Sequence, residues 1–153
     1  MRAVIQRVRE ASVKTGTATT AIGPGLLVLV AAAKDDSVSD ARYLADKIAA
    51  LRIMADANGK MNRSLTEVDG AILVVSQFTL YARTRKGNRP SFIDAAGTEA
   101  ARQLYESFIA RIKEHRLKVA TGSFGDYMLV SLLNDGPVTI IIDSKDREKP
   151  RRG

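Results

Sequence analysis

Two short polar segments hold the residues whose types and spacing could do chemistry. The first, Ser76-Gln77-Phe78-Thr79-Leu80, follows the apolar run Ala71–Val75. If that run is a strand, hydroxyls, an amide and main-chain N–H groups gather at its end, where the sites of α/β proteins often lie. Donors fixed in this way can stabilise an oxyanion. Taken alone, the segment is more simply explained as a strand that runs into solvent.

The second segment is Asn134-Asp135-Gly136-Pro137-Val138-Thr139. Asp-Gly is a common hairpin turn. In such a turn, however, the residue after glycine donates the closing N–H, and Pro137 has none. The bond before a proline can be cis at low cost, and Gly136 lacks the Cβ that would keep a ligand or another chain from its backbone. The pattern therefore indicates a connection other than a tight hairpin.

Conventional catalysts are scarce in this sequence. It has no cysteine and one histidine, His115, which we interpret as a solvated residue at the end of a helix. The sequence therefore lacks the residues needed for Ser-His-Asp sites, Cys-His sites and the usual His/Cys metal sites. Neither a metal nor a cofactor is predicted. The carboxylates of Asp35-Asp36 are interpreted as helix-start charges. An enzyme built in this way needs an activated substrate.

The hydrophobic pattern predicts the elements that position these segments. Apolar residues that recur at helical spacing predict one helix after Ser37 and another from Thr98. Alternating or continuous apolar runs predict strands. The expected strands are 2–13, 18–22, 26–33, 71–75, 127–133 and 138–142. Residues 55–69 and 83–90 are expected to be loops.

The order of these elements, β-β-β-α-β-α-β-β, predicts the α/β class. We expect a single domain with a mixed, mostly antiparallel, barrel-like β-sheet and two helices packed on one side. The chain of 153 residues fits one such domain, which we place at 1–143. Residues 144–153 are mostly charged, and we expect them to form a flexible tail.

The formal net charge is +7, and an excess of this size attracts polyanions such as nucleic acid. Four cations, Arg83, Arg85, Lys86 and Arg89, follow the first polar segment, which favours contact with nucleic-acid phosphates there; a solvated loop is the alternative. The N-terminus lacks the apolar region of a signal peptide, and the longest apolar run is too short to span a bilayer. We therefore expect a cytoplasmic protein with no membrane contact.

The two polar segments together resemble the signature pair of the D-aminoacyl-tRNA deacylase family, the D-tyrosyl-tRNA(Tyr) deacylases. Three further blocks resemble this family in the same order: Ile5-Gln6-Arg7-Val8, Gly59-Lys60-Met61-Asn62 and Arg89-Pro90-Ser91-Phe92. The likeness runs from residue 1 to about residue 142. Two blocks depart from the family, Val30-Ala31-Ala32-Ala33 and Gly125-Asp126-Tyr127-Met128. These departures leave the shape of the pocket and the preferred tRNA open.

The resemblance implies an editing hydrolase that cleaves the ester of D-aminoacyl-tRNA, and of glycyl-tRNA mischarged on tRNA(Ala). It implies a homodimer in which Gly136-Pro137, in cis, is inserted from the partner subunit. The backbone carbonyls of that segment would form a wall that rejects L side chains. It also implies that the ribose 2′-hydroxyl assists attack by water. Arg7 and Asn134 are the expected supporting residues, although a solvent-facing Arg7 is equally compatible with the sequence.

For the chemistry, we hypothesise that the main-chain N–H groups of Phe78 and Thr79 form the oxyanion hole. Ser76 and Gln77 are the other candidate catalytic residues. The Thr79 hydroxyl is either a nucleophile or, with no neighbouring base to take its proton, a positioning group. Three alternatives remain at this point: a sibling enzyme with a trans Gly-Pro that removes L-alanine from tRNA(Thr), a non-catalytic tRNA-binding module, and a purely structural homo-oligomer.

Overall fold

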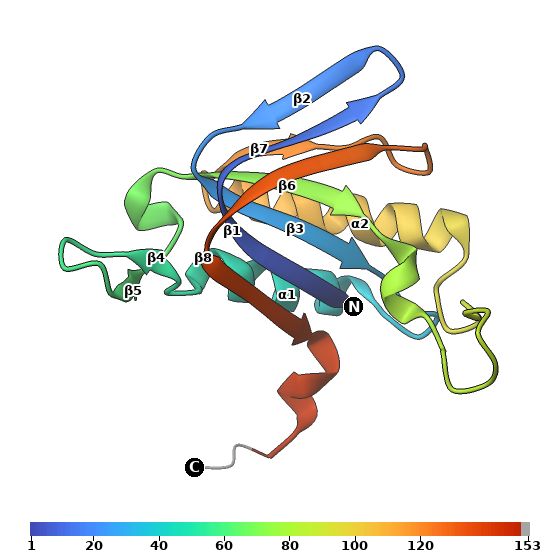
Figure 1. Cartoon of the computed structure of the whole chain (residues 1–153). Coiled ribbons are helices and arrows are strands. Elements are labelled where there is room, and N and C mark those ends of the chain that lie inside the picture. The colour runs from blue at the N-terminus through green and yellow to red at the C-terminus, as the bar shows by residue number, and fades with distance from the viewer. Residues whose placement is uncertain (151–153) are drawn as a thin grey trace.

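The computed structural model describes residues 1–150 and is built around one six-stranded sheet (Figure 1). Its strands are β1 (Arg2–Thr15), β2 (Ala18–Ile22), β3 (Gly25–Ala31), β6 (Ala71–Ser76), β7 (Lys118–Thr121) and β8 (Leu129–Asp143). β8 pairs with one edge of β1, and β2 and β3 pair with the other, all antiparallel. β3, β6 and β7 run parallel to one another. The sheet curls until β2 approaches β6 and β7, which confirms the predicted mixed, barrel-like α/β fold.

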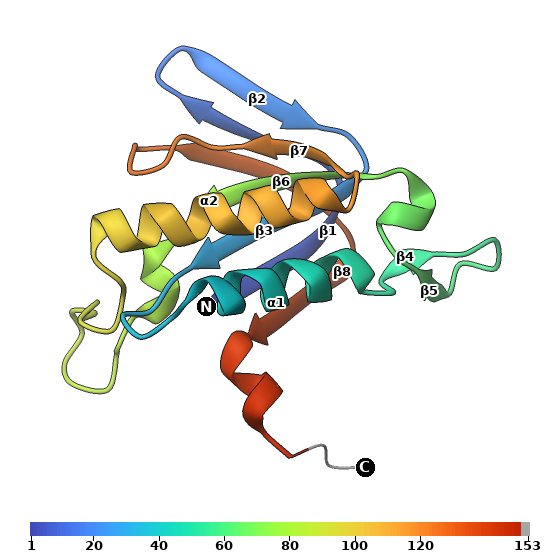
Figure 2. The ribbon, with the colours of Figure 1, turned by 180° about the vertical axis from the view of Figure 1, so that it is seen from behind.

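Two helices, α1 (Val38–Ala50) and α2 (Thr98–Glu114), cover the same face of this sheet (Figure 2). Both helices agree with the sequence prediction, as does the start of α1. Ser37 forms a capping box there, in which its main-chain N–H donates to the Asp40 carboxylate (2.8 Å). The apolar stripes of the helices bury Leu44, Ile48 and Phe108 against the sheet.

The central strands β3 and β6 are buried on both faces. Val28 and Val74 point into the core beneath the helices, whereas Leu27 and Leu73 join a second cluster inside the curl of the sheet. This double burial explains why residues 71–75 are continuously apolar instead of alternating. It also holds the end of β6 rigidly, at the point where the first polar segment begins.

Gly25 leaves no room for a Cβ beside Ala71 of β6, and its replacement by alanine should disrupt the fold. A Cβ at Gly25 would lie 1.8 Å from the carbonyl oxygen of Ala71, a main-chain atom that cannot move aside alone. We expect a loss of unfolding free energy on the order of 3 kcal/mol or more, measured by urea denaturation. Gly23→Ala is the matched control, because a Cβ there meets no atom within 4 Å. Equal stability of the two variants would contradict this packing.

Three parts of the chain differ from the sequence prediction. The expected loop 55–69 contains a small hairpin, β4 (Met54–Ala55) with β5 (Met61–Arg63), and a 3₁₀ turn, η1 (Thr66–Val68). The sequence does not predict β7, because its four residues, one exposed and three half-buried, are too few to show a hydrophobic pattern. The two strands expected at 127–133 and 138–142 are one strand, β8. The pairing of β8 with β1 shifts register around Val8 instead of breaking, so Gly136-Pro137 lies within a strand and not between two.

The segment expected to be a charged tail begins with a 3₁₀ turn, η3 (Ser144–Glu148), which packs on α1. Ser144 is fully buried, Lys145 pairs with Asp35 (2.9 Å) and Arg147 pairs with Asp40 (3.2 Å). Residues 151–153 of the expected tail lie outside the described residues. Within residues 1–150, no helix combines the length and apolar character needed to cross a membrane.

Candidate functional site

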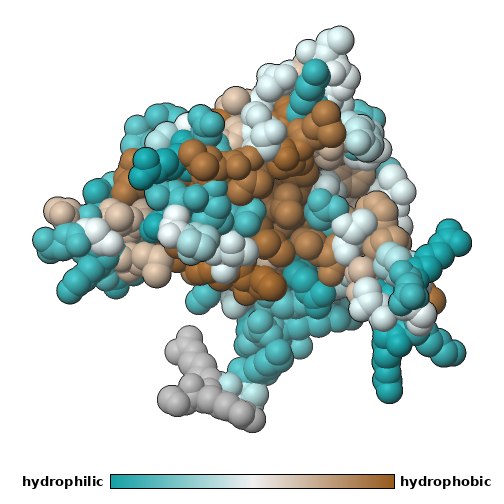
Figure 3. Space-filling model, in the orientation of Figure 1, coloured by the Kyte–Doolittle hydropathy of each residue, from teal (hydrophilic) through white to brown (hydrophobic). Residues whose placement is uncertain are grey.

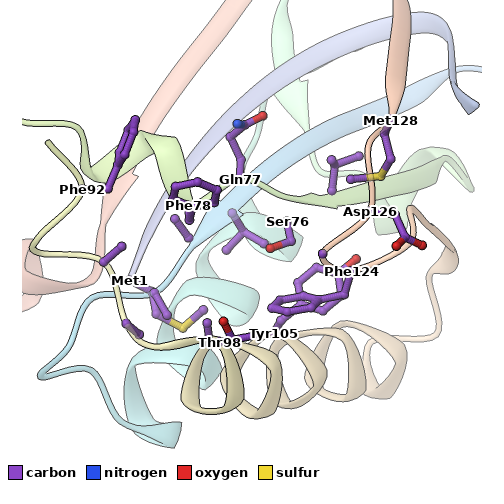
Figure 4. A pocket seen from close by; sticks show the side chains of 18 of the residues that line it. Met1, Ser76, Gln77, Phe78, Phe92, Thr98, Tyr105, Phe124, Asp126 and Met128 are labelled. Atoms are coloured by element: carbon purple, nitrogen blue, oxygen red, sulfur yellow. The ribbon is translucent and has the colours of Figure 1, made fainter. Parts of the chain in front are cut away.

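A cavity of about 620 Å³ opens at the carboxyl ends of β3 and β6, beside the N-terminal half of α2 (Figure 4). Three residues of the first polar segment, Ser76, Gln77 and Phe78, line one side of it. The opposite wall is formed by residues 124–128, in the connection between β7 and β8. Because parallel strands end at a common edge, the fold places the predicted segment at a recess, as the sequence suggested.

At the end of β6 the chain turns into a short 3₁₀ helix, η2 (Phe78–Tyr81). The turn is anchored where the Gln77 N–H donates to the Val30 carbonyl oxygen (2.9 Å), and the Leu80 N–H donates back to Gln77 (3.1 Å). Among residues 1–150, no acceptor pairs with the N–H groups of Phe78 and Thr79. A helix start leaves such groups without an intrahelical partner, so both remain available to an incoming oxygen atom.

The Thr79 hydroxyl is exposed beside the cavity and does not line it. It accepts a hydrogen bond from the side-chain amide of Gln77, with Nε2 2.5 Å from Oγ1. An amide N–H is a donor and cannot take the proton of the hydroxyl. The geometry at Thr79 therefore matches a positioning group better than a nucleophile.

His115 lies away from this cavity. His115 ends α2 as expected and its side chain is 31% exposed, and its Nε2 also lies 2.6 Å from the carboxylate of Asp46 on α1. Arg111 also binds Asp46 and lowers the pKa of that carboxyl group. The cavity meets α2 at Tyr105 and earlier residues, and ten residues of helix, about 15 Å, separate Tyr105 from His115.

The far wall of the cavity contains residues that sequence reasoning did not assign to the site. Tyr105 donates its hydroxyl to the Val74 carbonyl oxygen (3.1 Å), and burial raises its pKa to about 12, so it remains protonated. Phe124 packs on Tyr105, with ring centroids 5.5 Å apart. Asp126 is the one charged side chain in the lining, as far as the described residues show. The departure at Gly125–Met128 is the only signal in the sequence that marks this wall.

The second polar segment lies within β8, opposite Arg7, and its Gly136-Pro137 bond is cis. The Asn134 side chain closes over the segment, accepting from the Val138 N–H (2.8 Å) and donating to the Val138 carbonyl oxygen (3.2 Å). Arg7 donates to the carbonyl oxygens of Asp135 (2.7 Å) and Ile53 (2.8 Å). The Arg7 side chain is only 13% exposed, so it braces the segment of its own chain and does not face solvent.

The two polar segments are far apart within one chain. Arg7 pairs with Leu26, and Leu26 pairs with Ile72, four residues before Ser76. The segments are therefore offset by about 13 Å along the strands and by three strand spacings, about 14 Å, across the sheet. The fold of one chain does not bring them together.

Three contacts hold the basic loop, residues 83–90, and the last of them joins it to the site. Arg83 and Ser91 exchange main-chain hydrogen bonds (2.7 and 3.0 Å) that close the base of the loop, and the Arg83 guanidinium forks onto Asp94. Phe92 packs edge-on against Phe78 of η2, with ring centroids 5.1 Å apart. Three exposed cations of the loop form no ion pair within the described part of the chain: Arg85, Lys86 and Arg89.

Fold and cavity together define a one-domain α/β protein with free main-chain donors at the edge of a mixed sheet. The D-Tyr-tRNA(Tyr) deacylase family matches residues 4–143. The D-aminoacyl-tRNA deacylase of Anaeromyxobacter dehalogenans is 58% identical over 146 residues, which cover 95% of this chain and 98% of that protein. This chain therefore belongs to the D-Tyr-tRNA(Tyr) deacylase family.

Two solved structures are similar to this fold. The structure named "c-Myc DNA Unwinding Element Binding Protein" is 40% identical, with a TM-score of 0.87 over 94% of this chain and 98% of that one. A structure described as "a probable eukaryotic D-amino acid tRNA deacylase" is 18% identical and has a TM-score of 0.81 over 93% of this chain and 98% of that one. The second likeness supports the fold alone.

Proposed function

We propose that this protein hydrolyses the ester bond of D-aminoacyl-tRNA, releasing the free D-amino acid and the tRNA. The observation that carries the proposal is the family match over nearly the whole chain. The site is compatible with this function, because the free N–H groups of Phe78 and Thr79 lie beside the cavity and can bind an oxyanion. No histidine of the described residues lines the cavity. We place the reaction in the cytoplasm, where aminoacyl-tRNA is made and used.

Side-by-side deacylation of D-tyrosyl-tRNA and L-tyrosyl-tRNA under single-turnover conditions tests this function. Rapid cleavage of the D ester alone is the expected result. Glycyl-tRNA should also be cleaved, because glycine has no side chain for a steric wall to reject. Cleavage of L-alanyl-tRNA with D-tyrosyl-tRNA left intact would assign the sibling activity instead. Salt-dependent tRNA binding with no cleavage would indicate a non-catalytic RNA-binding module.

In the proposed mechanism, the N–H groups of Phe78 and Thr79 bind the carbonyl oxygen of the ester as it becomes an oxyanion. Each such donor contributes on the order of 3–4 kcal/mol when it is fixed in advance. Water, assisted by the ribose 2′-hydroxyl, attacks the carbonyl carbon. The bond to the ribose oxygen then breaks, and that oxygen takes up a proton. Ser76 and Gln77 shape the same edge, and Gln77 orients the Thr79 hydroxyl.

Thr79→Ala should retain most of the single-turnover activity, within roughly 10-fold of wild type, because the variant keeps the main-chain donor and loses only a positioning hydroxyl. Thr79→Ser, which keeps the hydroxyl, is the matched control and should resemble wild type. If Thr79 were the nucleophile, the alanine variant would lose on the order of 10⁴-fold or more, and a covalent acyl-enzyme would appear by mass spectrometry.

Selection of the D enantiomer follows from fixing two substituents of the substrate. Suppose that η2 binds the carbonyl oxygen and that an acceptor binds the α-amino group. The hydrogen and the side chain on the α-carbon then exchange places between the two enantiomers. We assign the wall that the L side chain meets to Gly136-Pro137 of a second subunit, because these residues lie at the other end of the sheet from Phe78 within one chain. Arg7 and Asn134 hold that wall in place.

A homodimer is therefore part of the proposal. β8, which carries the wall, exposes five large apolar side chains in the single chain: Leu129, Val130, Leu132, Leu133 and Ile141. Apolar residues gather on the face that β8 presents in Figure 3. A contiguous apolar surface of this kind marks an interface more often than it remains in water. Sedimentation equilibrium should give twice the mass of the chain.

Alanine replacements in the basic loop should weaken tRNA binding by removing phosphate contacts. We assign these contacts to Arg85, Lys86 and Arg89, while Arg83 supports them by bracing the loop on Asp94. Removing any one of the three cations should reduce the slope of log K against log salt by about one unit. Lys113→Ala, an exposed lysine near the other end of α2, is the control and should leave the slope unchanged. An unchanged slope for all three loop variants would contradict this assignment.

A further inference from the structure

The guanidinium group of Arg2 joins three segments that are distant in the sequence. Arg2 begins β1, and its NH1 donates to the carbonyl oxygen of Leu80 (2.9 Å). Its Nε donates to the carboxylate of Asp143, at the end of β8 (3.1 Å). Its central carbon lies 4.8 Å from the centroid of the Tyr81 ring. Leu80 and Tyr81 are the last two residues of η2, the turn that carries the free N–H groups.

η2 has polar anchors to the sheet at both of its ends. At its N-terminal end, the Gln77 N–H donates to the carbonyl oxygen of Val30 in β3. At its C-terminal end, the carbonyl oxygen of Leu80 accepts from Arg2. The Tyr81 ring packs among small residues, and its buried hydroxyl has no hydrogen-bond partner within residues 1–150. The ring is therefore held by packing and by the Arg2 cation on its face, with no polar bond of its own.

We propose that Arg2 is a positioning residue for deacylation: it fixes the carboxyl end of η2 and thereby aims the N–H groups of Phe78 and Thr79 at the ester oxygen. This inference rests on the proposed role of those two groups. Arg2 does not line the cavity, so it acts on the substrate only through the main chain of η2. Because an oxyanion forms only in the transition state, a misaimed donor lowers kcat and leaves KM nearly unchanged.

An arginine suits this task better than a lysine. The planar guanidinium places donors in fixed directions, so one group binds Asp143 with one edge, reaches Leu80 with NH1 and still lays its face on Tyr81. A lysine ammonium has no flat face and no fork, so it can keep the charge pair with Asp143 but not all three interactions at once. Lysine should therefore restore part of the function of Arg2, and glutamine less.

The experiment compares Arg2→Gln, Arg2→Lys and Arg111→Gln with wild type. Arg111→Gln is the matched control, since Arg111 also forks onto one carboxylate, that of Asp46, but joins α1 to α2 away from η2. Steady-state kcat and KM are measured with D-tyrosyl-tRNA. Thermal unfolding is followed for each variant, and the amide signals of Phe78 and Thr79 are compared by ¹⁵N NMR.

Arg2→Gln should lower kcat on the order of 10- to 100-fold with KM within about 2-fold, and Arg2→Lys should lie between it and wild type. The amide signals of Phe78 and Thr79 should shift in both. Arg111→Gln should lose similar stability with kcat unchanged. If Arg2→Gln loses stability but keeps kcat, or if both glutamine variants lose kcat equally, the positioning role is overturned. Wild type that fails to cleave D-tyrosyl-tRNA would overturn the proposed function instead.

Discussion

Replacing Phe78 by proline should lower the single-turnover rate constant for D-tyrosyl-tRNA by about 100- to 1,000-fold relative to Phe78→Ala. Both variants lose the aromatic ring, but only proline also loses the main-chain N–H. The ratio of their rate constants therefore isolates one donor of the proposed oxyanion hole. No other side-chain replacement can make this measurement, because the group under test belongs to the backbone.

The fold should accept proline at this position. Phe78 is the first residue of η2, its N–H has no acceptor among the described residues, and proline is favoured at the first position of a helix. Gln77, which precedes it, already has a non-helical backbone (φ −144°, ψ 75°). Circular dichroism and thermal unfolding should show that the two variants are equally folded. Equal rate constants for the proline and alanine variants would rule out the Phe78 N–H as a catalytic donor.

Gly136→Ala should weaken discrimination between D- and L-tyrosyl-tRNA. A Cβ at Gly136 would lie 2.7 Å from the main-chain nitrogen of Val138, and the residue has φ +155°. The segment must shift to relieve this clash, so its carbonyl groups leave the position where they would meet an L side chain. The ratio of D to L rate constants should fall at least about 10-fold, which corresponds to roughly 1–3 kcal/mol of steric selection. Gly23→Ala serves again as the control, and an unchanged ratio for Gly136→Ala would contradict the wall.

Mixing two defective variants tests whether the wall comes from a second subunit. In a heterodimer of Phe78→Pro with Gly136→Ala, one site combines the intact η2 of one chain with the intact wall of the other, and the second site contains both defects. After equimolar unfolding and refolding together, cleavage of L-tyrosyl-tRNA should fall to about half of that of the two variants mixed without unfolding, since half of the intact η2 turns then face an intact wall. A site built within one chain would leave the rate of L-tyrosyl-tRNA cleavage unchanged by refolding the variants together.

Local sequence patterns are sufficient to predict much of this fold. Ser37 and the spacing of Leu44 and Ile48 mark α1, because capping and helical periodicity depend on neighbours within a few residues. The continuous apolar run before Ser76 marks β6 as a strand covered on both faces. Such a run places the polar segment at a strand end, so the cavity edge is predictable. The family likeness adds the expected role of Gly136-Pro137, which residue patterns alone do not supply.

Interactions between residues far apart in the chain decide the rest. The sequence predicts a connection between two strands at residues 134–139, and Pro137, which lacks an N–H, indicates that this connection is not a tight hairpin. In the folded protein, Arg7, 128 residues away from Asp135, binds the Asp135 carbonyl and keeps the segment within β8. The Phe124 wall and the bond from Arg2 to Leu80, 78 residues apart, depend equally on how the sheet and α2 are assembled. Partners of this kind leave no mark in any short window of sequence, since their distance is set by strand register and not by spacing along the chain.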